Sequence, residues 1–138
     1  MYQLEDYHVG WDTPGKDPSD SMPTGNGDIG LNVWTDPAGD VLVYLGKTDS
    51  WDENGRLLKV GRLRLHFDPS PFFQPESFRQ ELSLTESAVY LEANGFRLKI
   101  WVDANRPAVH LEGTGKQPCE VTAKLEIWRT EPTEMLLD

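Results

Sequence analysis

The chain has 138 residues, which is room for one domain with a core of its own. Its 13 Lys and Arg against 23 Asp and Glu give a net charge of -10, which argues against binding to nucleic acid or an anionic membrane, because both need clustered cations. The single cysteine, Cys119, excludes an internal disulfide and a CxxC metal site and is expected to be a small core residue.

The chain begins with a polar segment and an acidic, loop-rich region. Residues 1–6 show neither the basic nor the apolar part of an export signal. Residues 12–27 are rich in Pro, Gly and Asp, which predicts an irregular loop that is either functional or mobile. Residues 1–56 carry 3 basic and 11 acidic side chains, whereas residues 57–138 carry 10 and 12. The simplest interpretation of this acidic excess is a solvated surface.

Period-two alternation of apolar and polar residues then recurs along the chain, and it predicts about eight short strands. The expected strands are 29–34, 41–45, 60–67, 77–84, 88–93, 96–103, 108–112 and 121–127. Two prolines, Pro69 and Pro71, predict a break after the third of them. Many short strands separated by turns are typical of an all-β fold, an antiparallel β-sandwich.

The clearest unit is a hairpin around Asn94-Gly95, a favoured two-residue turn. This turn sets Ala93 opposite Phe96 and Leu91 opposite Leu98, so one face is wholly apolar. Trp101 falls on the opposite, polar face, which predicts that a second sheet, another domain or a ligand covers that face.

The segment Gly25-Asn26-Gly27-Asp28-Ile29-Gly30 has the letters of a dinucleotide-binding motif. A predicted strand follows it in place of the helix that would face the phosphates, so we interpret its glycines as turn and packing residues. His8, His66 and His110 share no metal-ligand spacing, so the sequence predicts no metal and no cofactor.

The segment 49–55 places Asp49, Asp52 and Glu53 around Trp51. Paired carboxylates and aromatic platforms are features of sugar sites, but an acidic turn that ends in Asn54-Gly55 explains the same residues.

Met135, Leu136 and Leu137 either continue into a larger architecture or fold back on the sandwich.

The stretch 21–30, the acidic segment 44–51, the strand 78–84 and the turn 104–109 resemble, in that order, motifs of family-95 glycoside hydrolases. Thr48 and Ser50 depart from the family's more acidic or amide-rich pattern. The chain is more similar to the N-terminal module of the family-5703 proteins of unknown function, found mainly in gut Bacteroidetes-type genomes.

This resemblance implies a supersandwich-like N-terminal domain over residues 1–138 that is one part of a larger, secreted or periplasmic protein. Its partner would be a C-terminal (α/α)6 catalytic domain of the same polypeptide. The catalytic residues would belong to that partner, so this chain alone would be no enzyme. The candidate positions at the substrate rim or at the domain interface are Asn26, Asp28, Asp49, Trp51 and Asp52. Two alternatives stay open: a stand-alone carbohydrate-binding module, and an interaction or adhesin sandwich without sugar binding.

Overall fold

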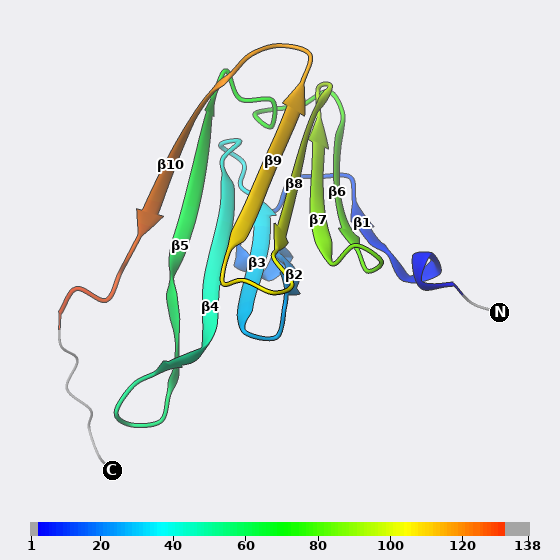
Figure 1. Ribbon diagram of the computed structural model, residues 1–138. Coiled ribbons are helices and arrows are strands. Elements are labelled where there is room, and N and C mark those ends of the chain that lie inside the picture. Colours follow the sequence, from blue (N-terminus) through cyan, green and yellow to red (C-terminus); the bar gives the residue numbers. More distant parts are fainter. Residues whose placement is uncertain (1–2, 132–138) are drawn as a thin grey trace.

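A computed structural model describes residues 3–131 and shows two five-stranded antiparallel sheets packed face to face (Figure 1). Sheet A contains, in spatial order, β1 (Val9–Trp11), β6 (Phe78–Ser83), β7 (Ala88–Ala93), β8 (Phe96–Val102) and β9 (Val109–Gly115). Sheet B contains β10 (Glu120–Glu126), β5 (Leu57–Asp68), β4 (Val41–Trp51), β3 (Ile29–Thr35) and β2 (Met22–Gly25). The prediction of an all-β antiparallel sandwich is confirmed.

Two short 3-10 helices complete the described elements, η1 (Leu4–Tyr7) and η2 (Pro18–Asp20). They have four and three residues. Within residues 3–131 there is therefore no helix that could reach across a lipid bilayer.

The hairpin of β7 and β8 has the predicted register, with Ala93 opposite Phe96 and Leu91 opposite Leu98. Its turn residues, Asn94 and Gly95, both have positive φ values, 49° and 77°, as the favoured two-residue hairpin turn requires. The turn thereby fixes which side chains of the hairpin enter the core.

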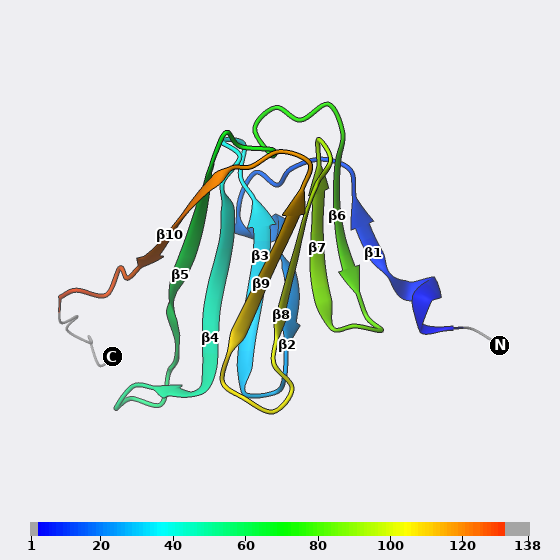
Figure 2. The same cartoon turned by 45° about the horizontal axis from the view of Figure 1, so that its top comes forward.

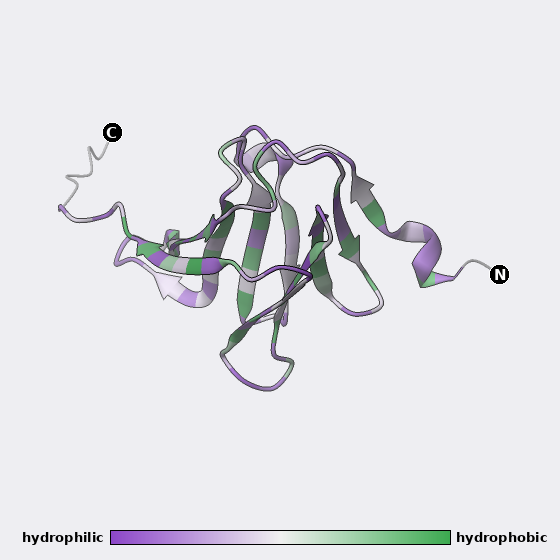
Figure 3. Cartoon of the chain, turned by 90° about the horizontal axis from the view of Figure 1, so that it is seen from above, coloured by the Kyte–Doolittle hydropathy of each residue, from purple (hydrophilic) through white to green (hydrophobic). Residues whose placement is uncertain are grey.

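The core lies between the two sheets. Figure 3 colours the ribbon by hydropathy and shows hydrophobic residues along strands of both sheets. Sheet A contributes Val89, Leu91 and Ile100, all fully buried, and sheet B contributes Val33 and Val43. Cys119 packs against the edge of this core, as predicted. Burial of this apolar surface is the main stabilising term for the domain.

The predicted loop 12–27 is in part regular structure. Residues Met22–Gly25 form strand β2, which pairs with β3 at the edge of sheet B and tolerates Pro23 because an edge strand has one unpaired side. The turn before β2 covers Trp34, and a Cβ built on Gly15 would lie 3.6 Å from the Cβ of Trp34. The expectation of an irregular segment is therefore wrong for β2, and β1 is a further strand that the pattern missed.

The polar face of sheet A is covered by its own side chains. The ring of Trp101 stacks on His110 of the neighbouring strand, with centroids 4.9 Å apart and planes 14° apart. Lys99 lies over the same ring and over Tyr90. Within residues 3–131 the neighbours of Trp101 on this face come from its own sheet, and the expectation that another domain or a ligand covers the face stays a prediction.

The two sheets are offset, so β10 is outermost at one side of the molecule and β1 at the other (Figures 1 and 2). Val121 and Leu125 of β10 align with Phe67 and Leu63 on the core side of sheet B. Although they share this face, Val121 is 49% exposed and Leu125 is 52% exposed. No described strand of sheet A is offset far enough to cover β10. The segment Met135–Leu137 lies outside the described residues.

Candidate functional site

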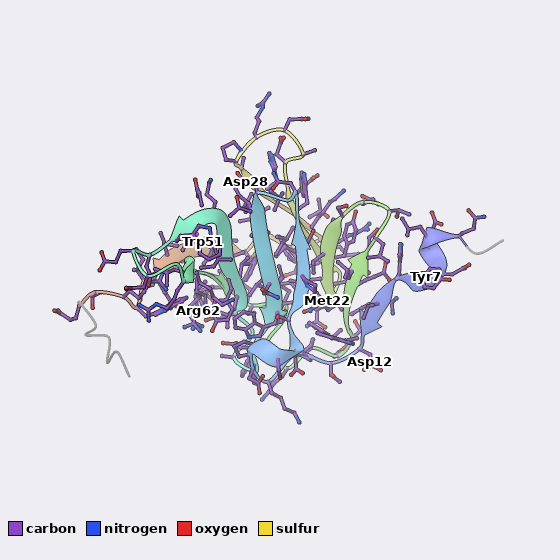
Figure 4. The ribbon with its side chains drawn as sticks, turned by 90° about the horizontal axis from the view of Figure 1, so that it is seen from below. Tyr7, Asp12, Met22, Asp28, Trp51 and Arg62 are labelled. Atoms are coloured by element: carbon purple, nitrogen blue, oxygen red, sulfur yellow. The ribbon has the colours of Figure 1, made fainter. Side chains whose placement is uncertain are left out.

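Four of the five candidate residues lie at one end of sheet B, where the β2–β3 turn and the β4–β5 hairpin are neighbours. Figure 4 views the molecule from this end and labels Asp28 and Trp51. The long strands β4 and β5 carry the hairpin beyond the body of the sheet (Figure 1). The fifth residue, Asn26, belongs to the same turn as Asp28 but points back toward sheet A.

The side chain of Asn26 connects the β2–β3 turn to the residue that follows β8 in the other sheet. Its Oδ1 accepts hydrogen bonds from the backbone N–H groups of Asp28 and Ile29, at 2.9 and 2.8 Å. Its Nδ2 donates to the carbonyl oxygen of Asp103, which follows β8 in the other sheet, at 2.8 Å. Asn26 therefore holds the two sheets together at this end and has little capacity left for a ligand.

Asp28 and Asp49 are brought together by a lysine. The Nζ of Lys47 lies 3.2 Å from Oδ1 of Asp28 and 2.7 Å from Oδ2 of Asp49. Asp28 also accepts a hydrogen bond of 2.8 Å from the hydroxyl of Thr48. The ammonium group of Lys47 therefore lies between the two carboxylates. A metal ion bound by both carboxylates, or a proton exchanged with a substrate there, would need this same position.

Trp51 is exposed to 57% and its position is fixed by one hydrogen bond. The indole Nε1 donates to the carbonyl oxygen of Thr48 at 2.7 Å. Leu57, its cross-strand partner, is 56% exposed. The pair forms an apolar surface at the end of the hairpin, and an indole held in this way offers its face to solvent.

Asp52 closes the hairpin turn. Its carboxylate accepts the backbone N–H groups of Asn54 and Arg56, at 3.0 and 2.8 Å. It also accepts the Nε of Arg56 at 2.6 Å. These bonds account for Asp52 as a turn residue, and no bond in the described chain joins it to Asp28 or Asp49.

The environment of Asp28 and Asp52 favours their charged forms. The hydroxyl of Thr48, followed by Lys47, holds the pKa of Asp28 below its usual value. The backbone N–H of Arg56 does the same to the pKa of Asp52, and hydrogen bonding to Asp49 raises the pKa of Lys47. A glycosidic general acid needs a raised pKa, so Asp28 and Asp52 are not suited to that role.

Beside this cluster lies a cavity of about 290 Å³ with a floor of glycine backbone. It is lined by Gly25, Gly27, Gly30, Gly46, Asp28, Ile29, Lys47, Thr48 and Leu57. Its walls are almost entirely apolar. We call this cavity the glycine groove.

Sequence analysis gave no role to Lys47 or Gly46, and it treated Gly30 as a turn or packing residue and Thr48 only as a departure from the family's pattern. Lys47 and Thr48 lie in the segment that the resemblance singled out for its acidic residues, and their ammonium and hydroxyl groups reach Asp28 only in the folded chain. Gly30 interrupts the predicted strand 29–34 where a side chain is expected, whereas Gly46 lies just beyond the predicted strand 41–45. The role of the five predicted residues at a sugar rim or a domain interface stays a prediction.

Among residues 3–131, no group of three His, Cys, Asp or Glu side chains is placed to hold a metal ion. Of the acidic residues near Trp51, Asp49 is instead paired with Lys47 and Asp52 with Arg56.

Comparison with known proteins gives one match. A family model, DUF5703_N, described as a domain of unknown function (DUF5703), matches residues 10–137. No curated protein and no solved structure matches the chain.

Proposed function

The chain belongs to the DUF5703_N family, and from this premise we propose that it is the non-catalytic N-terminal domain of a secreted or periplasmic glycoside hydrolase. In this proposal it packs on an (α/α)6 catalytic domain of the same polypeptide and helps to shape that domain's sugar site. The resemblance of the motif order to that of family-95 glycoside hydrolases supports the reaction class, and the placement of Asp28 and Asp49 together at one end of sheet B supports a role at the rim of the sugar site.

The observation that carries the proposal is the uncovered apolar face of β10. Val121 and Leu125 continue the core side of sheet B, yet about half of each side chain is exposed. Leu111 of β9, at the adjoining edge of sheet A, is 40% exposed. Apolar rows that continue a core are typical of surfaces that another part of a protein covers.

The test places a charge on each face of the same strand in the natural polypeptide that contains this chain. Leu125→Lys puts an ammonium on the apolar face and should lower both thermal stability and glycan hydrolysis, because a partner domain can no longer cover the face. Thr122→Lys is the matched control, since Thr122 is exposed on the opposite face of β10. Equal behaviour of the two variants, or a natural polypeptide that contains no further domain, overturns the proposal.

A second candidate is a carbohydrate-binding module, and the exposed indole of Trp51 favours it. Titration of the 138-residue chain with plant and host glycans, followed by tryptophan fluorescence, tests this candidate. Binding that is lost in Trp51→Ala and kept in Trp11→Phe would support the module. An interaction sandwich without sugar binding predicts no glycan response in the chain or in the natural polypeptide.

A further inference from the structure

Two of the four strand edges of the sandwich are long and regular. β9 and β10 each have seven residues, and each pairs with its inner neighbour in an unbroken register. The other two edge strands are shorter: β1 has three residues, and β2 has four and contains Pro23. An edge strand presents backbone N–H and C=O groups that have no partner strand, and a long, regular edge is a template for pairing with another chain.

The same two edges expose apolar side chains. Leu111 of β9 is the cross-strand partner of the buried Ile100, so it lies on the core side of sheet A, and it is 40% exposed. Val121 and Leu125 of β10 lie on the core side of sheet B and are about half exposed. β9 and β10 are the outermost strands on the same side of the two sheets (Figures 1 and 2), so a strand added to the free edge of β9 would lie over β10. It would cover all three side chains.

The outer faces of the two edges carry charges without a counter-ion. Within residues 3–131, four exposed charged side chains of these strands and of the loop between them make no hydrogen bond and no ion pair: Glu112, Lys116, Glu120 and Lys124. They alternate along the chain with the apolar residues and therefore point away from the core. Two are acidic and two are basic, so the edges complement each other in charge although the whole chain has a net charge of -10.

The strand β10 of a second copy fits the free edge of β9. Within one copy the two strands run in opposite directions (Figure 1), and a two-fold axis parallel to the strands preserves the direction of β10, so β10 of the second copy would meet β9 antiparallel. One register places Glu112 opposite Lys124 of the second copy, and the same register places Lys116 opposite Glu120. A shift by two residues in one direction would bring Glu112 opposite Glu126, and like charges directly opposite each other are destabilising. A shift by two residues the other way would leave none of the four charges opposite an Asp, Glu, Lys or Arg.

This register also matches the other side chains of the two edges. On the apolar side it sets Leu111 opposite Leu125 of the second copy. On the outer side it sets Thr114 opposite Thr122, and two threonines suit such a cross-strand position. Because β10 of each copy would then lie over β10 of the other, the exposed Val121 and Leu125 of the two copies would cover each other.

We propose that the 138-residue chain forms a two-fold symmetric dimer in which β9 of each copy pairs antiparallel with β10 of the other. The two sandwiches become one, since each layer joins sheet A of one copy to sheet B of the other. Two seven-residue strand pairs make a small interface, so the dimer should dissociate on dilution. The inference does not rest on the proposed function: a further domain that covered β10 in a natural polypeptide would displace the second copy.

Sedimentation of the 138-residue chain over a range of concentrations measures the dimer. Lys124→Glu should raise the dissociation constant at least about tenfold, because each dimer would then hold two carboxylates opposite Glu112. The fold should be kept, since position 124 lies opposite Arg64 in its own sheet, where a carboxylate is favourable. Lys16→Glu makes the same change of charge at an exposed residue before β2 and should leave the dimer intact.

A mixing experiment tests the register. Glu112→Lys should weaken the dimer as Lys124→Glu does, because two ammonium groups would face each other. An equal mixture of the two variants should dimerise like the wild type, since each contact in the mixed dimer again joins a carboxylate to an ammonium group. Far-UV circular dichroism of each variant confirms that the strands are retained.

Three results would overturn the inference. The first is a wild-type chain that stays monomeric at its highest soluble concentration, which would leave the proposed function untouched. The second is a dimer that Lys124→Glu and Lys16→Glu affect equally. The third is a mixture of the two variants that stays monomeric. A natural polypeptide without a further domain would defeat the proposed function alone and would leave the dimer standing.

Discussion

Arg64 on β5 donates a hydrogen bond from Nε to Glu126 at the end of β10, with 2.9 Å between Nε and Oε1. Arg62 makes a second contact with the same carboxylate at 2.6 Å, and Arg64 also reaches Asp40 at 2.7 Å. These charged groups lie on the outer face of sheet B. They fix β10 to β5, its strand neighbour in the sheet, on the face opposite to its exposed apolar side chains.

The first prediction concerns the anchoring of β10. Glu126→Gln removes the charge that both arginines share, and it should lower the free energy of unfolding by about 1–2 kcal/mol at pH 7. In Glu126→Gln, the backbone amides of Glu120–Glu126 should exchange with solvent faster than those of β7, because the substitution loosens β10 and leaves β7 in place. Hydrogen exchange measured by mass spectrometry checks this, with Glu120→Gln, an exposed carboxylate of the same strand, as the control. Equal exchange in both variants would contradict it.

The second prediction concerns acid. Hydrogen bonding to Arg64, followed by Arg62, holds the pKa of Glu126 below its ordinary value of 4.5. A carboxyl with a lowered pKa in the folded state stabilises the fold above its unfolded pKa, and this contribution is lost as pH falls through the folded pKa. The stability difference between the wild type and Glu126→Gln should therefore shrink as pH falls below about 4.5. Urea unfolding between pH 7 and pH 3 measures it, and a constant difference would count against the pairing.

The third prediction separates covered from uncovered apolar residues. Leu91 is fully buried, so Leu91→Ala should lower the free energy of unfolding by about 2–5 kcal/mol. Leu125→Ala should cost less than about 1 kcal/mol in the 138-residue chain, because half of this side chain is already in water. Denaturant titrations of the two variants provide the comparison. A large loss for Leu125→Ala in this chain would mean that the face of β10 is covered without a partner.

The fourth prediction concerns the hydrogen bonds by which Asn26 connects the two sheets. Asn26→Ala removes the Oδ1 that accepts hydrogen bonds from two backbone N–H groups and the Nδ2 that donates to the carbonyl oxygen of Asp103, and should cost about 2 kcal/mol. The amide protons of Asp28 and Ile29 should then exchange faster. Asn105→Ala, at an exposed position beyond Asp103, is the control and should change stability by less than about 0.5 kcal/mol. NMR hydrogen exchange would reveal the difference, and unchanged protection of Ile29 would refute the role of Asn26.

Part of the candidate site could be predicted from the sequence. The resemblance and the acidic composition directed attention to Asp28, Asp49 and Trp51, which the structure places at one end of sheet B. The groupings within the site could not be predicted. Lys47 reaches both Asp28 and Asp49 only because β3 and β4 pair in a register that sets Ile29 opposite Lys47. Asp52, close in sequence to Asp49, turns instead to its own hairpin.

The sequence by itself determined the strands that alternate strictly and the register of the β7–β8 hairpin. These features depend on local chemistry, namely a two-residue turn with positive φ values and one apolar face. Only the tertiary structure decided which apolar faces are covered. Val121 and Leu125 have the same alternation as Val89 and Leu91, yet the first pair is exposed and the second is buried. The reason is that burial depends on how far the two sheets are offset, and that offset is a relation between segments distant in the sequence.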